Sequence, residues 1–305
     1  MQTINVGSSK LESSRLVYGC MRIAGSGSRE DLDRGRRALG AAVDAGYTQF
    51  DHADIYGNGL CETAFGGFLR DNPGVREQII VTTKCGIRMA GDPDEDAPGR
   101  YDFSARHITT SVEGSLRRLG IERIDLLLLH RPDYLFRAHE VAVTLEALKA
   151  SGAVANFGVS NFTPSQVELL QSAVGDALLV NQVEINLHNT GALSDGTLDQ
   201  CQRLGMTPQA WCPLAGVAYP AWGNTFTAAD EQRIRAELRR QGEKYEVEDW
   251  LIALAWLLKH PAGISPIIGS TTPARIAAAK QALGLRYRRV DWYRLLEARN
   301  GAPVP

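Results

Sequence analysis

Short apolar segments alternate with helical patterns along nearly the whole chain, and this alternation restricts the possible folds more than any other feature. β-Branched and aliphatic segments predict eight strands, at 15–18, 48–50, 79–83, 124–129, 156–159, 179–183, 207–211 and 266–268. Apolar residues spaced three and four apart predict helices near 30–45, 61–71, 104–119, 139–151, 164–172, 197–204, 230–260 and 273–283. Eight β-then-α units of about 30 residues favour a closed (β/α)8 barrel, the TIM barrel.

Several of these strands are apolar throughout, and this favours a parallel sheet over an antiparallel one. The segment IDLLLLH (124–130) is typical of a strand that is buried on both faces. The alternative is an open doubly wound sheet, which needs a glycine-rich phosphate-binding turn after its first strand. The nearest match, Gly25 to Glu30, has Glu30 in place of the third glycine.

Two segments depart from the alternation. Residues 3–16 predict an N-terminal β-hairpin that precedes the first barrel strand. Residues 212–229 form a long loop of glycine, proline and aromatic residues after the seventh strand, and loops of such length are often functional. Because no linker composition interrupts the chain, we expect one domain over residues 1–305.

The charge balance and the cysteines bear on partners and location. A net charge of −2 gives no electrostatic reason to expect nucleic acid or an anionic membrane as partner. The basic runs 34–37 and 286–289 are short, and we expect them to be solvated helix faces. Five cysteines without a CxxC pair suit a reducing compartment. With no signal-peptide layout and no apolar run of about 20 residues, we expect a cytoplasmic protein, either a monomer or a weak oligomer.

Four titratable residues lie where barrel strands end, which is where barrel enzymes gather functional side chains. Asp51 and Tyr56 follow the second predicted strand, Lys84 the third and His130 the fourth. Lys84 beside Tyr56 would favour the phenolate and lower the pKa of Tyr56 toward neutrality. Asp51 would keep Lys84 charged. Tyr56 could then act as a general acid toward a carbonyl oxygen, with His130 orienting that oxygen or assisting the proton transfer.

The second half of the chain carries residues that suit a hydride-donating cofactor. Such a cofactor is needed because a proton donor alone cannot reduce a carbonyl. Ser160, Asn161 and Gln182 are hydroxyl and amide groups able to hold a nicotinamide carboxamide, and Trp211 could stack on its ring. The stretch 269–275 predicts a helix start with a threonine N-cap and proline at the first position. Helix N-termini bind phosphate, and the cationic Arg275 of the first turn could pair with it.

Seven motifs in this chain resemble those of the aldo-keto reductase superfamily, in the same order. They are FDHADIYG, VTTKCG, LLLLHRPD, FGVSNF, NQVEIN, AWCPLAG and IIGSTTPAR. The likeness covers roughly residues 3–303 and is closest to the bacterial oxidoreductase subgroup with FDHADIYG and LLLLHRP.

The resemblance implies a TIM barrel that binds NADPH (NADP+) in extended form without a Rossmann domain. It implies a catalytic tetrad of Asp51, Tyr56, Lys84 and His130, with Tyr56 as the acid. Ser270 and Arg275 match positions that hold the adenosine 2′-phosphate, which favours NADPH over NADH. The positions implied for cofactor binding are Met21, Arg22, Asp51, Ser160, Asn161, Gln182, Trp211, Cys212, Pro213, Leu214, Ile268, Gly269, Ser270, Thr271 and Arg275.

The chain also departs from the family pattern. Gly269 replaces a common lysine, and Ala278 and Ala279 replace an acidic residue and an asparagine, so we expect modest NADPH affinity and some use of NADH. The sequence stops soon after its last predicted helix, without a long C-terminal substrate loop, so we expect an open pocket. The expected apolar pocket wall consists of Met21, Ile87, Trp222 and the 212–229 loop.

Each candidate residue also has a structural explanation when it is taken alone. An aspartate at a strand end commonly caps a turn, and His52 follows Asp51 and is expected to point out of the barrel. Cys85 and Cys212 lie near the site, with packing the simpler role for both. No HExxH or comparable spacing is present, so we expect no metal.

Taken together, the residues predict a reductase that uses NADPH to convert aldehydes or ketones to alcohols, its partner being a small-molecule carbonyl substrate. One alternative is a nucleotide-sensing binding module of the same fold with little turnover, like potassium-channel β subunits. Another is a non-redox barrel enzyme, an isomerase or aldolase that uses Lys84.

Overall fold

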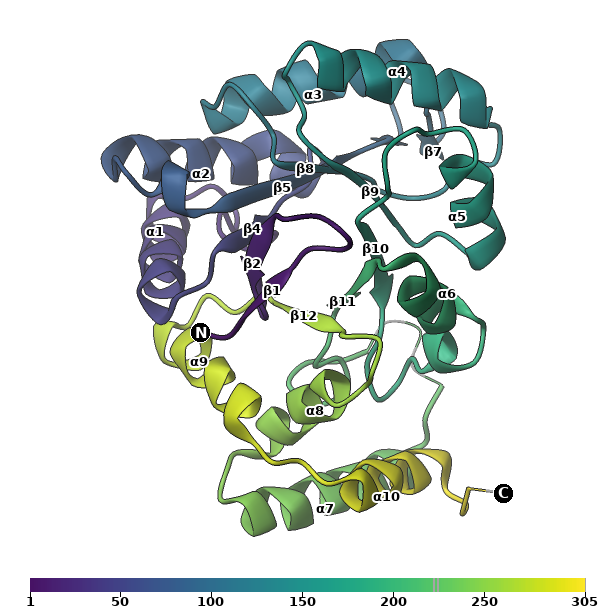
Figure 1. Ribbon diagram of the computed structural model, residues 1–305. Helices are drawn as coiled ribbons and strands as arrows, with labels where there is room; N and C mark the ends of the chain where they lie inside the picture. The colour runs from purple at the N-terminus through teal and green to yellow at the C-terminus, as the bar shows by residue number, and fades with distance from the viewer. Residues whose placement is uncertain (222, 224, 305) are drawn as a thin grey trace.

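Eight parallel strands close into a barrel in the computed structural model (Figure 1). The structure describes residues 1–221, 223 and 225–304. The strands are β3 (Val17–Gly19), β4 (Gln49–Asp51), β5 (Ile80–Cys85), β8 (Leu126–Leu129), β9 (Phe157–Ser160), β10 (Val180–Glu184), β11 (Thr207–Trp211) and β12 (Ser265–Ile268). Around the barrel their order is β10-β11-β12-β3-β4-β5-β8-β9, and β9 pairs with β10 to close it. The predicted (β/α)8 barrel is therefore confirmed, and the open sheet is excluded.

Helices surround the barrel in Figure 1, because each crossover between parallel strands returns along the outside. They are α1 (Arg29–Ala45), α2 (Leu60–Asp71), α3 (Ala105–Leu119), α4 (Ala138–Ala150), α5 (Pro164–Gln171), α6 (Thr197–Leu204), α7 (Ala228–Tyr245), α8 (Asp249–Leu258), α9 (Pro273–Ala278) and α10 (Arg289–Asn300). Short 3₁₀ helices are η1 (Tyr56–Gly59), η2 (Arg76–Gln78), η3 (Gly191–Leu193) and η4 (Ala279–Gly284).

The C-terminal helices differ from the sequence prediction. The single helix expected over 230–260 is two helices, because Glu246 adopts a left-handed conformation (φ 56°) and ends α7. α8 then packs against β12, while α7 packs against α10. The sequence analysis missed α10, whose Trp292 stacks on Trp256 of α8 with ring centroids 5.0 Å apart. Its apolar side chains meet α7 and α8, and local periodicity does not reveal such tertiary contacts.

The expected N-terminal hairpin is present and closes the barrel's amino end. β1 (Thr3–Asn5) pairs antiparallel with β2 (Glu12–Ser14). Val6 then packs among residues of β5, β8 and β10, and the backbone N–H of Gly7 donates to Thr207 Oγ1 at 2.8 Å. A second hairpin that was not predicted, β6 (Ile87–Arg88) with β7 (Arg100–Tyr101), follows β5.

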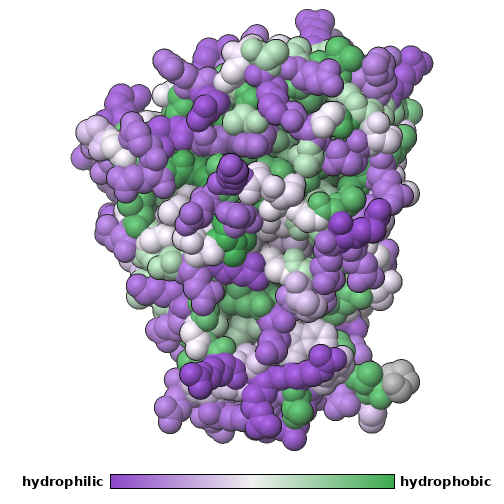
Figure 2. All heavy atoms as spheres, viewed as in Figure 1, coloured by the Kyte–Doolittle hydropathy of each residue, from purple (hydrophilic) through white to green (hydrophobic). Residues whose placement is uncertain are grey.

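The loop expected over 212–229 extends to Thr227, where α7 begins with that residue as its N-cap. Trp222, expected in the pocket wall, lies outside the described residues. The face in Figure 2 mixes hydrophilic and hydrophobic residues, with hydrophilic side chains over the outer helices. Among the described residues, no helix has the length and apolarity needed to cross a membrane.

Candidate active site

The predicted site residues meet at one rim of the barrel, because parallel strands present their carboxyl ends at the same side. Asp51 is the last residue of β4, and Lys84 lies near the end of β5. His130 follows β8 directly, and Tyr56 begins η1 after β4. The fold therefore brings together the four side chains that the sequence analysis grouped.

A buried ion pair joins two of them. The Lys84 ammonium donates to Asp51 Oδ2 at 2.7 Å, to the backbone oxygen of His52 at 2.8 Å and to Tyr56 Oη at 3.3 Å. Lys84 is fully buried, and Asp51 is 3% exposed. A buried ammonium is costly unless its donors are satisfied, and here all three protons have an acceptor.

The ion pair fixes the charge of Lys84. Burial lowers the pKa of the Lys84 ammonium, but Asp51 and Tyr56 raise it by more, so its pKa is above the ordinary lysine value. A lysine that forms a Schiff base must first lose its proton. The charged state of Lys84 therefore argues against the isomerase or aldolase that would use this lysine.

The pKa of Tyr56 differs from the sequence prediction. Burial raises the pKa of the phenol, and this effect outweighs the lowering by Lys84. The expected shift toward neutrality is therefore wrong. Sequence reasoning weighed the nearby charge and missed the desolvation, which depends on packing that only the fold defines.

His130 faces Tyr56 as a neutral imidazole. The two ring centroids are 6.0 Å apart, with an interplanar angle of 84°. Burial lowers the pKa of His130 well below its ordinary value, and the cations Lys84 and Arg131 lower it further. Its Nδ1 is buried without a hydrogen-bond partner among the described residues. The side chain can thus offer an uncharged hydrogen-bonding group beside the phenol.

A chain of amide side chains crosses the barrel interior beneath the ion pair. Gln182 Nε2 donates to Asp51 Oδ1 at 3.0 Å and to Gln209 Oε1 at 3.2 Å. Gln209 Nε2 donates in turn to Gln49 Oε1 at 3.2 Å, and Gln49 Nε2 donates to Thr82 Oγ1 at 2.9 Å. Gln49 and Gln209 were not predicted. A glutamine inside an otherwise apolar strand is the signal that could have found them.

The amide and aromatic residues of the next strands form a connected cluster. Ser160 Oγ donates to the backbone oxygen of Gln182 at 2.8 Å and accepts from Asn161 Nδ2 at 2.8 Å. Trp211 Nε1 donates to Asn161 Oδ1 at 2.9 Å, and the Arg131 guanidinium lies 5.4 Å from a Trp211 ring centroid. The structure therefore brings together Ser160, Asn161 and Trp211, which were predicted to hold a nicotinamide. It also places Arg131 beside them, a residue that was not predicted.

The loops after β11, β12 and β3 continue this rim, since these strands are neighbours in the barrel. Arg22 lies 5.1 Å above the ring of Tyr219 from the 212–227 loop. Met21 is 47% exposed, and its backbone oxygen accepts from Cys61 Sγ. The other predicted cofactor positions here are Cys212, half-buried with φ 49°, Pro213, buried, and Leu214, half-buried.

The predicted phosphate-binding segment has the expected local structure. Thr272 is the N-cap of α9 and Pro273 its first residue, as the sequence predicted. Ser270 Oγ accepts from the backbone N–H of Thr272 at 3.1 Å, and Arg275 is exposed. Ile268 ends β12 in the core, and Gly269 and Thr271 beside Ser270 are half-buried.

Three further titratable residues, His52, Asp54 and Glu62, lie close to the tetrad. His52 points out of the barrel as expected, and its ring packs at a tilt against Phe65 of α2, with centroids 4.5 Å apart and an interplanar angle of 57°. Burial, with Lys84, lowers the pKa of His52 to about 3. Burial and then the nearby Glu62 raise the pKa of Asp54, in the turn before Tyr56, to about 7. Glu62 is anchored by Arg118 at 2.7 Å. Asp54 and Glu62 were missed by the sequence analysis.

The thiols and possible metal ligands near the site have no evident chemical role. Cys85 is buried, and burial raises the pKa of its thiol well above the ordinary value. Burial also raises the pKa of Cys212. Within the described part of the chain, no cluster of three or more His, Cys, Asp and Glu side chains is arranged to hold a metal ion.

This chain is similar to known oxidoreductases over nearly its whole length. The sequence profile of the Aldo/keto reductase family matches residues 15–299. A 6-dehydroglucose reductase from Agrobacterium fabrum is 41% identical over 302 residues, covering 97% of this chain and 98% of the relative. An uncharacterized oxidoreductase of Bacillus subtilis is 40% identical, with 97% of each chain covered. The solved glycerol dehydrogenase of Gluconobacter oxydans matches with TM-score 0.85 and 25% identity, over 99% of this chain and 97% of that one.

The buried pair yields a stability prediction. Lys84→Met leaves the Asp51 carboxylate buried without its cation, so the free energy of unfolding at pH 7 should fall by about 3–5 kcal/mol. Adding Asp51→Asn should restore most of that loss, because a neutral pair needs no counter-charge. Urea unfolding of the single and double variants measures both changes.

The matched control is Lys149→Met, which breaks a surface ion pair with Asp176 whose partners are 45% and 46% exposed. It should change the free energy of unfolding by less than about 1 kcal/mol. A Lys84→Met variant as stable as this control would contradict the assigned role of the pair.

Proposed function

The chain belongs to the aldo/keto reductase family, and from this premise we propose that it reduces aldehyde or ketone carbonyls to alcohols with NADPH, Tyr56 being the proton donor. The observation that carries the proposal is the contact of the buried, ion-paired Lys84 ammonium with Tyr56 Oη at 3.3 Å. A proton donor with a fixed cation beside it suits a reaction in which negative charge develops on oxygen.

NADPH, when bound, supplies the hydride that reaches the carbonyl carbon. Tyr56 Oη gives its proton to the carbonyl oxygen as that oxygen becomes an alkoxide. An alkoxide is a stronger base than a phenolate, so the transfer is downhill even with the raised pKa of Tyr56. Lys84 stabilises the phenolate that remains, and solvent then returns the proton.

His130 is proposed to orient the carbonyl oxygen. Its imidazole is neutral at pH 7 and lies edge-on to the Tyr56 ring. A neutral imidazole can donate one hydrogen bond to the oxygen without competing for the Tyr56 proton. Asp51 does not need to touch the substrate, since its carboxylate is engaged by Lys84 and Gln182.

The donor set fits a nicotinamide dinucleotide. Gln182 uses its Nε2 for Asp51 and Gln209, so its Oε1 can accept from the nicotinamide carboxamide. Ser160 and Asn161 would flank that carboxamide, and Trp211, held by Asn161, would present its ring to the nicotinamide.

The other cofactor positions belong to the neighbouring loops. Ser270 and the exposed Arg275 would bind the 2′-phosphate. The remaining proposed contacts are Met21, Arg22, Asp51, Cys212, Pro213, Leu214, Ile268, Gly269 and Thr271.

We propose a sugar aldehyde as the first substrate to test. The 41% identical relative from Agrobacterium fabrum is a 6-dehydroglucose reductase, and the match spans 97% of this chain. Arg131 follows His130 at the rim, and its guanidinium carries several hydrogen-bond donors, which suits a hydroxylated substrate. Steady-state NADPH oxidation with 6-dehydroglucose, methylglyoxal and 4-nitrobenzaldehyde would test this choice. Tight NADPH binding without turnover on any of them would instead support the nucleotide-sensing module.

We also propose a cellular location and an assembly state. All five cysteines are free thiols, which suits the cytoplasm. We propose one domain and a monomer or weak oligomer, which sedimentation velocity would test.

Tyr56→Phe removes the donated proton while keeping the ring. Carbonyl reduction should fall about 10²–10⁴-fold, because that is the usual contribution of a general acid. NADPH affinity, measured by quenching of tryptophan fluorescence, should stay within about twofold. Tyr134→Phe, at a tyrosine that is 84% exposed, is the control and should keep full activity. Near wild-type reduction by Tyr56→Phe would show that the acid is another group.

The pH dependence follows from the direction of the Tyr56 shift. A phenol with a raised pKa stays protonated at neutral pH, so reduction should be nearly flat between about pH 6 and 9 and decline only as pH rises through the Tyr56 pKa. Alcohol oxidation with NADP+ needs the phenolate and should rise with pH over the same range. Initial rates in both directions measure this, and reduction that is half lost near pH 7 would contradict it.

Arg275→Ala tests cofactor choice. Loss of the cation proposed at the 2′-phosphate should raise the KM for NADPH at least about tenfold, while the KM for NADH changes less than about twofold. Lys280→Ala, at an exposed cation in η4, is the control. Equal losses for both cofactors in Arg275→Ala would refute the 2′-phosphate role.

A further inference from the structure

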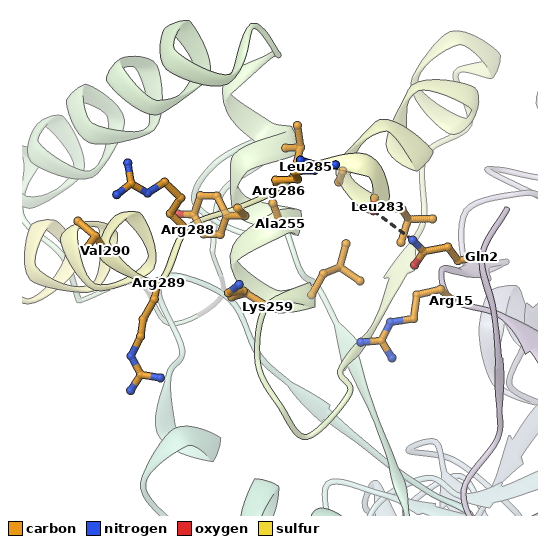
Figure 3. Close-up of a pocket in the computed structure, with 13 residues that line it drawn as sticks. Gln2, Arg15, Ala255, Lys259, Leu283, Leu285, Arg286, Arg288, Arg289 and Val290 are labelled. Carbon is orange, nitrogen blue, oxygen red and sulfur yellow. Dashed lines mark hydrogen bonds between the residues drawn. The ribbon is translucent and has the colours of Figure 1, made fainter.

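A cavity of about 570 Å³ lies at the opposite end of the barrel from Tyr56. Its wall includes Arg15, which precedes β3, and Lys259, which follows α8 and precedes β12. Both residues therefore stand at the amino ends of barrel strands, whereas Tyr56 stands at the carboxyl ends. The remaining wall comes from Gln2, from the last turn of α8 and from the segment that runs from η4 into the start of α10 (Figure 3).

Positive charge dominates this cavity. Five cationic residues line it, and no aspartate or glutamate does: Arg15, Lys259, Arg286, Arg288 and Arg289. Within the described part of the chain, none of the five forms an ion pair with a carboxylate. The run 286–289 was expected to be a solvated helix face: its three arginines are exposed as expected, but residues 286–288 precede α10 and are not helical, and the run lines the cavity.

Local structure holds some of these charges in place. Arg15 Nη1 donates to the backbone oxygen of Gly263 at 2.6 Å, which fixes one edge of the guanidinium and leaves its other donors free to bind. In Figure 3, Arg15 and Lys259 extend from different sides of the cavity. α10 begins at Arg289, its N-cap Arg288 makes no side-chain capping hydrogen bond, and the buried Asp291 of its first turn pairs with Lys244 and does not line the cavity.

We propose that this cavity binds a small molecule with two or more linked phosphate groups. A multivalent anion would reduce the mutual repulsion of the five cations. Arginine also presents paired hydrogen-bond donors that match phosphate oxygens. The volume is in the range of small-ligand sites, about 300–1,000 Å³. Because the charges surround a cavity rather than form a stripe, a compact polyphosphate fits better than a nucleic acid. The proposal does not depend on the reductase activity.

Isothermal titration with sodium pyrophosphate tests the site, using protein saturated with NADP+ so that the proposed cofactor site is occupied. The wild-type protein should bind pyrophosphate, and added NaCl should weaken that binding. The triple variant Lys259→Gln, Arg286→Gln, Arg289→Gln should raise the dissociation constant at least about tenfold. All three residues are exposed, so the variant should fold, and circular dichroism checks this. If it does not fold, the three single variants replace it, each raising the dissociation constant severalfold.

The matched control is Lys10→Gln with Arg239→Gln, which removes exposed cations outside the cavity. It should leave the dissociation constant within about twofold of wild type, since long-range charge effects are screened by salt. Absence of pyrophosphate binding by the wild-type protein, or equal weakening in the control and cavity variants, would overturn the proposal. Carbonyl reduction, assayed in parallel, tests the reductase proposal separately, since no cavity residue belongs to the tetrad.

Discussion

The rest of the active site depends on the buried contact between Lys84 and Asp51. The pair is 2.7 Å apart and almost fully excluded from solvent, so each charge requires the other. The barrel makes the contact possible because neighbouring parallel strands, β4 and β5, bring their carboxyl ends together. With Lys84 charged, Tyr56, the proposed proton donor, lies beside a fixed cation, and the same cation helps to keep the His130 imidazole neutral.

The polar interior of the barrel supports this pair from below. Gln182, Gln209 and Gln49 connect Asp51 to Thr82 through side-chain hydrogen bonds inside a closed sheet. Such a chain satisfies buried amides and orients the carboxylate, so that Asp51 presents Oδ2 to Lys84. The same fold separates two proposed sites in space, with the reductase chemistry at the carboxyl rim and the cationic cavity at the amino end.

The sequence predicted the barrel, the hairpin and the proximity of Asp51, Tyr56, Lys84 and His130, because strand ends are recognised from local sequence and the barrel then brings them together. It failed where tertiary contacts decide. Glu246 ends α7 in a left-handed turn within a continuous helical pattern, and α10 packs through Trp292 on another helix. The pKa direction of Tyr56 was wrong because desolvation depends on the full packing. The arginines of the run 286–289 are exposed as expected, but the cavity that they line was missed because it forms between distant segments.

In the proposed mechanism, Lys84 favours the Tyr56 phenolate and so lowers the pKa of Tyr56 against the larger rise that burial causes. The direct test replaces Tyr56 with 3,5-difluorotyrosine, a more acidic phenol, and follows phenolate absorbance against pH with and without Lys84→Met. The account predicts that removing the cation raises the pKa of this phenol by at least about one unit, equivalent to about 1.4 kcal/mol. An unchanged or lowered pKa in the Lys84→Met protein would contradict it.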